Sequence, residues 1–478
     1  MTVARRPRVG FDKVKVTRAG RLGSLGVHDD LHARVMHLAA DDGPALVVSL
    51  DHMGLSPGQS VAVKSRLARA CGIAADRIVI FYTHTHAGVE FRAAALAELL
   101  ARAAERARDK AGPAEIAYTK VDVDRRYSVN RRAELAHGLG AVSIIFNRNI
   151  SVDLRKGTEE VGRQIRDLIT RGVNIWGTNY LEPDKDPDRP SRPLSPKQAD
   201  LLGELPEQIY LDGPVDSDLE WLAFRGERGR WLGSIVRFSA HPVIWRKTIT
   251  GLISADYPGV FCAHMEDATD GAPALFVNGP CGNVKPLYPR NTEEEMDRVG
   301  GSLARELLRR GSHLSWRALG RALLVERKER FPVHDDVRKH AGRWPVEEAA
   351  ARFHHLARRG DDPIAMKRAL DWSLRCWGNA AVGWRRPTIS LPFHLLAFDD
   401  IALLGMPTEV WCEVGLSVKA ATHDKRVIVG ALCDACTNYV PVSGALSNGG
   451  YEAVNSMLDD CAAGRFAAIG TALANDSI

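Results

Sequence analysis

The sequence predicts an α/β protein with a mixed β-sheet core flanked by helices. Apolar runs rich in β-branched residues, at 45–50 (ALVVSL) and 78–82 (IVIFY), indicate buried strands. Each run is followed by a stretch with helical spacing of its apolar residues, at 60–71 and 91–110. This alternation of strands and helices is typical of a sheet covered by helices, with functional residues where the strands end.

The other expected strands follow from the same kind of pattern. The sequence between 219 and 238 predicts a hairpin, because two apolar runs flank the turn sequence Gly-Glu-Arg-Gly-Arg. Further strands are expected at 115–123, 141–146, 401–404 and 427–431. Since these elements extend over most of the chain, we expect a single domain covering residues 1–478.

A proline-rich segment at 150–215 interrupts this pattern. Among its residues, Pro183, Pro187, Pro190, Pro193 and Pro206 interrupt any regular element. We expect a long excursion from the core here, a candidate lid, with one helix near 158–170.

A second insertion is expected at 340–385. Helical periodicity at 346–359 and 363–382, with Gly-Asp-Asp between them, predicts an inserted helical hairpin. The hairpin could pack on the core, cover the site or form a subunit surface, and core packing is the simplest of these.

The composition argues against several classes of function. A formal charge of +5 without a dense Lys/Arg run gives no reason to expect nucleic-acid binding. The sequence contains no apolar run of about 18 residues, so no membrane span is expected. The N-terminus lacks the apolar core of a signal peptide. Eight cysteines in 478 residues are no disulfide framework. We therefore expect a cytoplasmic protein without stable membrane association.

One cysteine pair has a suggestive spacing. Cys433 and Cys436 form a CxxC motif, which could be redox-active or bind a metal. Because a second pair is missing, a structural role is the more economical interpretation.

The most informative residues are two histidines at the end of the strand 78–82. His84 and His86 are spaced i and i+2, so in extended chain their side chains point to the same side. Two imidazoles at the rim of a sheet are well placed to bind a divalent metal. The alternative is two polar residues that simply close a strand.

Three further candidate ligands are expected near strand ends. They are His241, Glu409 and Tyr439, which come after the strands at 231–238, 401–404 and 427–431. Each alone could be a buried, hydrogen-bonded side chain. As a set, imidazole, carboxylate and phenol groups suit Zn²⁺ with an open position for water.

A series of short segments resembles the neutral/alkaline (non-lysosomal) ceramidase family, in its N-terminal catalytic domain. The matching segments run in family order through 26–34 (GVHDDLHAR), 49–51 (SLD), 83–88 (THTHAG), 130–131 (NR), 238–242 (FSAHP), 253–259 (ISADYPG), 276–286 (FVNGPCGNVKP), 405–409 (GMPTE), Tyr439 and 450–452 (GYE). Members of this family are zinc amidases that hydrolyse the N-acyl bond of ceramide. The resemblance implies zinc ligands at His84, His241, Glu409 and Tyr439, with His86 and Arg131 in the same pocket.

Departures from the family pattern bear on the substrate. Lys285 stands where the family has an active-site serine, and Asn283 stands where it has an aspartate. The resemblance also implies an immunoglobulin-like C-terminal domain and an export signal, and the sequence predicts neither. We therefore expect the family's chemistry on a different and more polar substrate.

The expected function is a zinc-dependent amidohydrolase that cleaves an N-acyl bond of a small polar, anionic metabolite through an activated water. The catalytic candidates are His86 as proton shuttle, Arg131 and Tyr439 as donors to the oxyanion, and Lys285. Lys285, Arg131 and Arg246 would make the pocket cationic, although Arg246 could equally be a surface charge.

Several alternatives remain open. Asp51 and Asp256 could orient a ligand imidazole, or Asp51 could cap its strand. The bond cleaved could be an ester, lactone or glycoside, or the chain could be a catalytically silent binding protein. The expected partner is a small molecule, and a homo-oligomer is compatible with the sequence.

Overall fold

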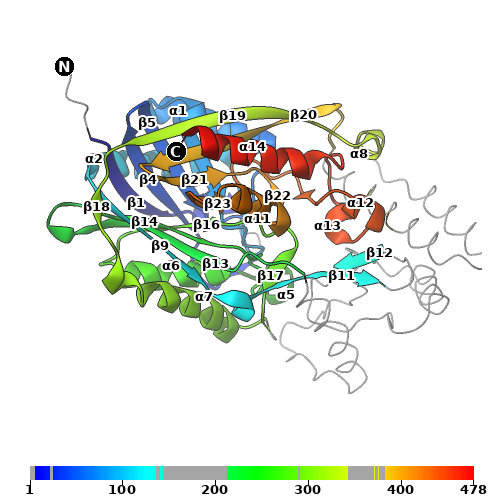
Figure 1. The fold of residues 1–478 in the computed structure, drawn as a ribbon, viewed down its shortest axis with the longest axis horizontal. Helices are drawn as coiled ribbons and strands as arrows, with labels where there is room; N and C mark the ends of the chain where they lie inside the picture. Colours follow the sequence, from blue (N-terminus) through cyan, green and yellow to red (C-terminus); the bar gives the residue numbers. More distant parts are fainter. Residues whose placement is uncertain are drawn as a thin grey trace, which may run out of the picture.

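The computed structural model describes residues 6–21, 25–135, 140–143, 213–288, 291–342, 371, 375 and 383–477. Three larger β-sheets form the core of this part of the chain, and helices cover them (Figure 1). The predicted mixed sheet core flanked by helices is confirmed, with the strands divided over several sheets. The helix at 158–170 lies outside the described residues, as do most of the excursion at 150–215 and of the hairpin at 340–385, so these three stay predictions.

The first sheet leads to His84. Its strands, in the order β6-β5-β4-β1-β8, are β6 (Ile78–Tyr82), β5 (Gly43–Leu50), β4 (His32–Ala40), β1 (Arg8–Lys15) and β8 (Gly112–Pro113). Helices α1 (Pro57–Cys71) and α2 (Ala93–Asp109) pack against each other, and α2 covers β1 and β4. Helix α1 begins earlier than expected because Ser56 forms a capping box with Gln59 and Pro57 occupies the first turn.

The second sheet leads to His241. Its strands, in the order β16-β14-β13-β9-β18, are β16 (Ala274–Asn278), β14 (Trp231–Phe238), β13 (Asp218–Arg225), β9 (Glu115–Asp122) and β18 (Arg317–Ala318). The predicted hairpin is confirmed as β13 and β14, which pair antiparallel. Helices α6 (Asp256–Asp267) and α7 (Glu293–Leu308) pack together and cover this sheet (Figure 1).

The third sheet leads to Glu409 and Tyr439. Its strands, in the order β19-β20-β21-β23, are β19 (Ala322–Pro332), β20 (Thr388–Phe398), β21 (Ile401–Gly405) and β23 (Arg426–Gly430). Helices α11 (Cys412–Ala421) and α14 (Ala462–Ser477) cover it, on the opposite side of the view from α6 and α7 (Figure 1). The predicted strands at 401–404 and 427–431 are confirmed to within one residue at either end.

Short two-stranded pairs accompany the larger sheets in the described part of the chain. They are β2 (Gly20–Arg21) with β7 (Glu90–Phe91), β3 (Gly26–Val27) with β15 (Leu252–Ile253), β10 (Ser128–Asn130) with β17 (Val284–Pro286), β11 (Arg132–Leu135) with β12 (Gly140–Ser143), and β22 (Glu409–Val410) with β24 (Tyr439–Val440). The remaining short helices are α5 (Lys247–Thr250), α8 (Asp335–Lys339), α12 (Ala445–Asn448) and α13 (Tyr451–Val454). Strands β22 and β24 run parallel and pair Glu409 with Tyr439.

An apolar core joins the three larger sheets. Phe11 of the first sheet lies 5.4 Å, between ring centroids, from Phe224 of the second sheet. Phe224 lies the same distance from Phe398 of the third sheet. Aromatic side chains bury large areas and favour such tilted and edge contacts, so they hold the strand ends that carry the candidate ligands in a fixed arrangement.

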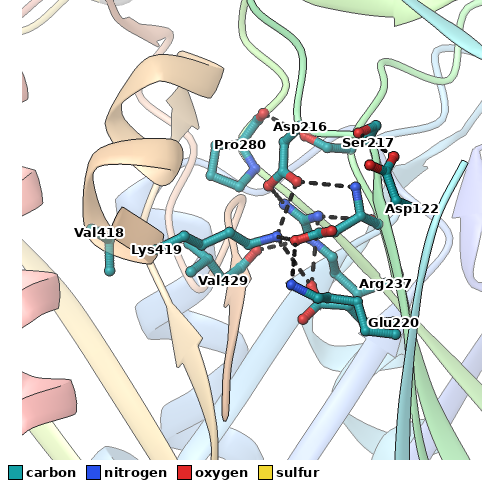
Figure 2. Close-up of polar contacts among 12 residues, drawn as sticks. Asp122, Asp216, Ser217, Glu220, Arg237, Pro280, Val418, Lys419 and Val429 are labelled. Carbon is teal, nitrogen blue, oxygen red and sulfur yellow. Dashed lines mark hydrogen bonds and ion pairs between the residues drawn. The ribbon is translucent and has the colours of Figure 1, made fainter. Parts of the chain in front are cut away.

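A buried ionic cluster joins the second sheet to α11 (Figure 2). Arg237 of β14 donates to the Asp216 carboxylate and, through Nε, to the Val429 carbonyl oxygen at 3.0 Å. Lys419 of α11 lies 3.0 Å from Asp216 and 3.4 Å from Glu220. Because each buried charge has a partner of opposite sign, the cluster ties two layers together without an isolated charge.

We expect Lys419→Met to lower the free energy of unfolding by about 3 kcal/mol, since the variant leaves buried carboxylates with one cation fewer. Lys120→Met is the matched control, because Lys120 and Lys419 both bond Asp218, at 3.2 and 2.9 Å, but Lys120 is about half exposed. The control should lose less than about 1 kcal/mol. Chemical denaturation of both variants measures the difference, and equal losses would contradict a special role for the buried cluster.

Candidate metal centre

His84 is held by an unusual backbone conformation and by one hydrogen bond. Its φ of 72° lies in the left-handed region, so the chain does not continue as the extended strand expected from the sequence. The ring Nδ1 bonds the carbonyl oxygen of Met53. A backbone carbonyl can only accept, so Nδ1 carries the proton and the Nε2 lone pair is left for another partner.

His241 is fixed in the same way. It follows β14, and its ring Nδ1 bonds the Cys281 carbonyl oxygen at 2.6 Å. Burial and then the nearby Arg131 guanidinium lower the pKa of His241 to about 3. The imidazole is therefore neutral, and its Nε2 has a lone pair that can bind a metal ion.

Glu409 meets both imidazoles with one oxygen atom. Its Oε2 lies 3.3 Å from Nε2 of His84 and 3.1 Å from Nε2 of His241. Burial acts to raise the pKa of Glu409, but the two imidazoles offset this, and the pKa lies well below its usual range. Glu409 is therefore a charged carboxylate that faces the Nε2 atoms of both imidazoles.

His86 completes a group of three imidazoles. Each of His84, His86 and His241 offers one ring nitrogen that could bind a metal, and these nitrogen atoms all lie within 4.8 Å of one another. The sequence predicts a proton shuttle at His86, and the structure also brings His86 within reach of an ion shared with His84 and His241. Burial and the His84 ring hold the pKa of His86 well below its ordinary value.

Tyr439 and Arg131 form one wall of the centre. The Tyr439 ring stacks on His241 with centroids 6.2 Å apart, and Arg131 Nη2 donates to the Tyr439 hydroxyl at 3.2 Å. Glu452 balances the Arg131 charge through a bond of 2.6 Å to Nε. Burial raises the pKa of Tyr439 well above its ordinary value, so the phenol is neutral in this arrangement.

The residues fit a divalent metal ion. Among the described residues, the Nε2 atoms of His84 and His86 are buried and have no hydrogen-bond partner. An unpartnered buried nitrogen is costly, and an ion between the rings and Glu409 would satisfy it. Imidazole nitrogens with one carboxylate are ligands that zinc favours.

Two carboxylates that could have oriented the ligands bond other groups instead. Asp51 accepts from the His32 amide at 2.8 Å and pairs with Arg34 at 3.4 Å, which supports the strand-cap alternative. Asp256 accepts from the backbone amides of Trp245 and Tyr257. The ligand rings are oriented instead by backbone carbonyls, which the sequence could not reveal because every residue has one.

Lys285 and Arg246 are both buried near the centre. Lys285 lies in β17 opposite Val129, two residues before Arg131. Burial, and then the charges of Arg246 and Arg131, lower the pKa of Lys285 to about 7. Arg246 is only 8% exposed, so its alternative as a surface charge is wrong.

One cavity in the described part of the chain is separate from this centre. It has a volume of 560 Å³ and is lined mainly by residues of α1 and α2, including Arg66, Arg69 and Arg102. None of the candidate ligands lines it.

The comparisons with known proteins agree with this architecture. The structure is similar to neutral ceramidase from Pseudomonas aeruginosa, with a TM-score of 0.65, 18% sequence identity, and coverage of 98% of this chain and 75% of that chain. It is also similar to a ceramidase complexed with C2, with a TM-score of 0.62, 17% identity and the same coverage. No protein-family model and no curated protein matches the sequence.

At this level of identity the likeness concerns the fold. The chain has the fold of the neutral ceramidases, as the sequence segments indicated. In the part of the chain that the structure describes, no helix is both long and apolar enough to cross a membrane.

We expect the purified protein to bind about one divalent metal ion per chain at this centre. His84→Ala and His241→Ala should each lose the ion, because each removes one of the converging nitrogen atoms. Elemental analysis after incubation with zinc and gel filtration measures the content. His37→Ala is the control, since His37 is also buried but lies in β4. Absence of metal from the wild type would contradict the assignment.

Proposed function

We propose that the protein is a zinc-dependent hydrolase that cleaves the amide (N-acyl) bond of a small polar, anionic metabolite. The single observation that supports this most is the convergence of Glu409 Oε2 with the Nε2 atoms of His84 and His241. The fold likeness to ceramidases favours an amide among the bonds that such a centre could cleave.

Four side chains would hold the ion. His84, His241 and Glu409 face one another, and the Tyr439 hydroxyl lies on the Arg131 side of the same space. Bound zinc lowers the pKa of a water molecule toward about 7 and polarises a carbonyl group. The neutral phenol of Tyr439 is suited to donate a hydrogen bond to an oxygen atom as it gains charge.

His86 and Arg131 would manage protons and charge. His86 is neutral, so it can accept a proton from the attacking water and return it to the leaving amine. Arg131 keeps its charge, is fixed by Glu452 and Gly282, and lies next to Tyr439. A fixed guanidinium in a buried site stabilises the oxyanion without reorganising.

Buried positive charge supports an anionic substrate. Lys285, Arg246 and Arg131 lie close enough for the two arginines to lower the pKa of the lysine, so they repel one another. A carboxylate or phosphate of the substrate would offset this repulsion. Lys285 would therefore bind substrate at the position where the resemblance implies a serine.

Two alternatives would use the same centre. An ester, lactone or glycoside could be the substrate, because the donor set does not distinguish these bonds from amides. A catalytically silent binding protein is less well supported, since unpartnered imidazole nitrogens have no evident purpose without an ion.

We expect Glu409→Gln to abolish turnover with little loss of folded protein, because the amide keeps the shape and loses the charge. The assay would compare zinc-loaded enzyme on N-acyl amino acids, a short-chain N-acylsphingosine, esters and glycosides. Glu266→Gln is the control, as Glu266 is equally buried but pairs with Arg34 and Lys13 instead. Full activity of Glu409→Gln would contradict the role of Glu409 in the metal centre. Preference for the N-acylsphingosine would contradict the proposal of a small polar substrate.

We expect Lys285→Met to raise KM for a carboxylate-bearing amide about tenfold at pH 6, since a charge-assisted hydrogen bond is lost. The effect should shrink above pH 7, where the wild-type lysine loses its proton because its pKa is about 7. The uncharged methylamide of the same substrate is the control. An equal KM change for both substrates would contradict an anion-binding role.

We also expect the same variant to be more stable than the wild type at pH 6. The pKa of Lys285 is lower in the folded protein than its ordinary 10.5, so the unfolded chain binds more protons between pH 7 and 10.5. Wild-type stability should therefore rise with pH in this window and approach that of the variant. Denaturant titrations at pH 6 and 9.5 measure the gap.

A further inference from the structure

The CxxC motif remained without a role in the proposed reaction. Cys433 and Cys436 are both free thiols. Cys433 is fully buried, and its Sγ lies where a Cβ on Gly405 would clash, at 2.7 Å. Cys436 is only partly buried and its Sγ lies 3.6 Å from Oε1 of Glu409. The two cysteines therefore have different surroundings, and of the two it is Cys436 that contacts a candidate ligand.

Because of the contact with Cys436, the two oxygen atoms of Glu409 have different partners. Oε2 faces the nitrogen atoms of His84 and His241, whereas Oε1 faces the thiol. A thiol is a weak donor, and a charged carboxylate is the acceptor that strengthens it most. Such a bond fixes the rotation of the carboxylate, so that one oxygen atom points at the imidazoles.

Cys436 also touches the loop that orients His84. Its backbone amide donates to the Leu55 carbonyl at 2.9 Å. A Cβ on Gly54 would lie 2.6 Å from the Cys436 Cβ, so the loop and the cysteine are in close contact. The same loop contains Met53, whose carbonyl oxygen bonds Nδ1 of His84. Cys436 thus contacts one candidate ligand, Glu409, and the loop that orients another, His84.

Asp434 anchors the segment from the other side. Its carboxylate accepts from the Ile80 amide at 2.9 Å, from Nε2 of His394 at 2.7 Å and from the Lys64 ammonium. His394, Cys433 and Asp434 are close enough to resemble a second metal site. The bonded Lys64 ammonium argues against that interpretation, since it already supplies the positive charge. The cluster fixes the segment to β6, which leads to His84.

We propose that Cys436 is a positioning residue of the metal centre, whose thiol holds Glu409 by donating to Oε1 while its backbone holds the loop behind His84. This inference rests on the proposed function, because it concerns the affinity of the same centre for zinc. It assigns the CxxC motif to the support of a ligand instead of to redox chemistry or to direct metal binding.

The test is the zinc affinity of the purified apoprotein, measured by competition with a chromophoric chelator. Cys436→Ala should bind zinc about tenfold more weakly, as expected for loss of an outer hydrogen bond. Cys436→Ser should stay within about threefold of the wild type, because the hydroxyl is also a donor. Cys433→Ala is the matched control, and its affinity should not change even if its melting temperature falls.

Cobalt substitution distinguishes support from ligation. The wild type loaded with Co²⁺ should lack the strong near-ultraviolet absorption of a thiolate bound to cobalt. Such a band, lost in Cys436→Ser, would show a direct ligand and overturn the proposal. Unchanged affinity in Cys436→Ala, or equal weakening in the serine and alanine variants, would also overturn it. A wild type that binds zinc in neither assay would overturn this inference and the proposed function together.

Discussion

The contact of Glu409 with two imidazoles is the constraint on which the rest of the centre depends. His84 follows a strand of the first sheet, His241 follows a strand of the second, and Glu409 follows the third. Three buried groups can face one another at 3.1 to 3.3 Å only if the sheets are fixed in register. The aromatic core and the cluster around Arg237 supply that rigidity, because neither layer can move without exposing a cavity or an unpaired charge.

Strained backbone also occurs in the segments that carry the candidate ligands. His84, Thr408, Leu432, Asp434 and Asn438 all have positive φ angles, although none is glycine. Left-handed backbone is unfavourable for such residues and persists only where the surroundings determine it strongly. Here the surroundings are the bonds between neighbouring segments, such as that from the Thr408 amide to the Ala435 carbonyl at 2.7 Å. The strain brings side chains of separate loops to one point.

Three buried arginines of the described structure are each paired with a carboxylate. Arg131 is balanced by Glu452, Arg237 by Asp216 and Arg34 by Glu266, each pair being almost completely buried. At Lys285, burial and the two neighbouring arginines lower the pKa. A basic group whose surroundings disfavour its charge is a site where an incoming anion gains most. The same physical rule thus separates the framework charges from the one that we assign to substrate binding.

The sequence by itself indicated part of the strands and helices, such as the strands at 45–50 and 78–82 and the hairpin between 219 and 238, because apolar periodicity records which side of an element is buried. It led to no prediction for the long strands β4, β19 and β20. It also indicated His84, His86, His241, Glu409 and Tyr439 as a candidate set, through their positions near strand ends. The tertiary structure decided what the sequence could not express: the left-handed turn at His84, the carbonyls of Met53 and Cys281 behind the ligands, and the placement of Cys436 beside Glu409. These depend on contacts between residues far apart in the chain, and local patterns contain no information about such distances.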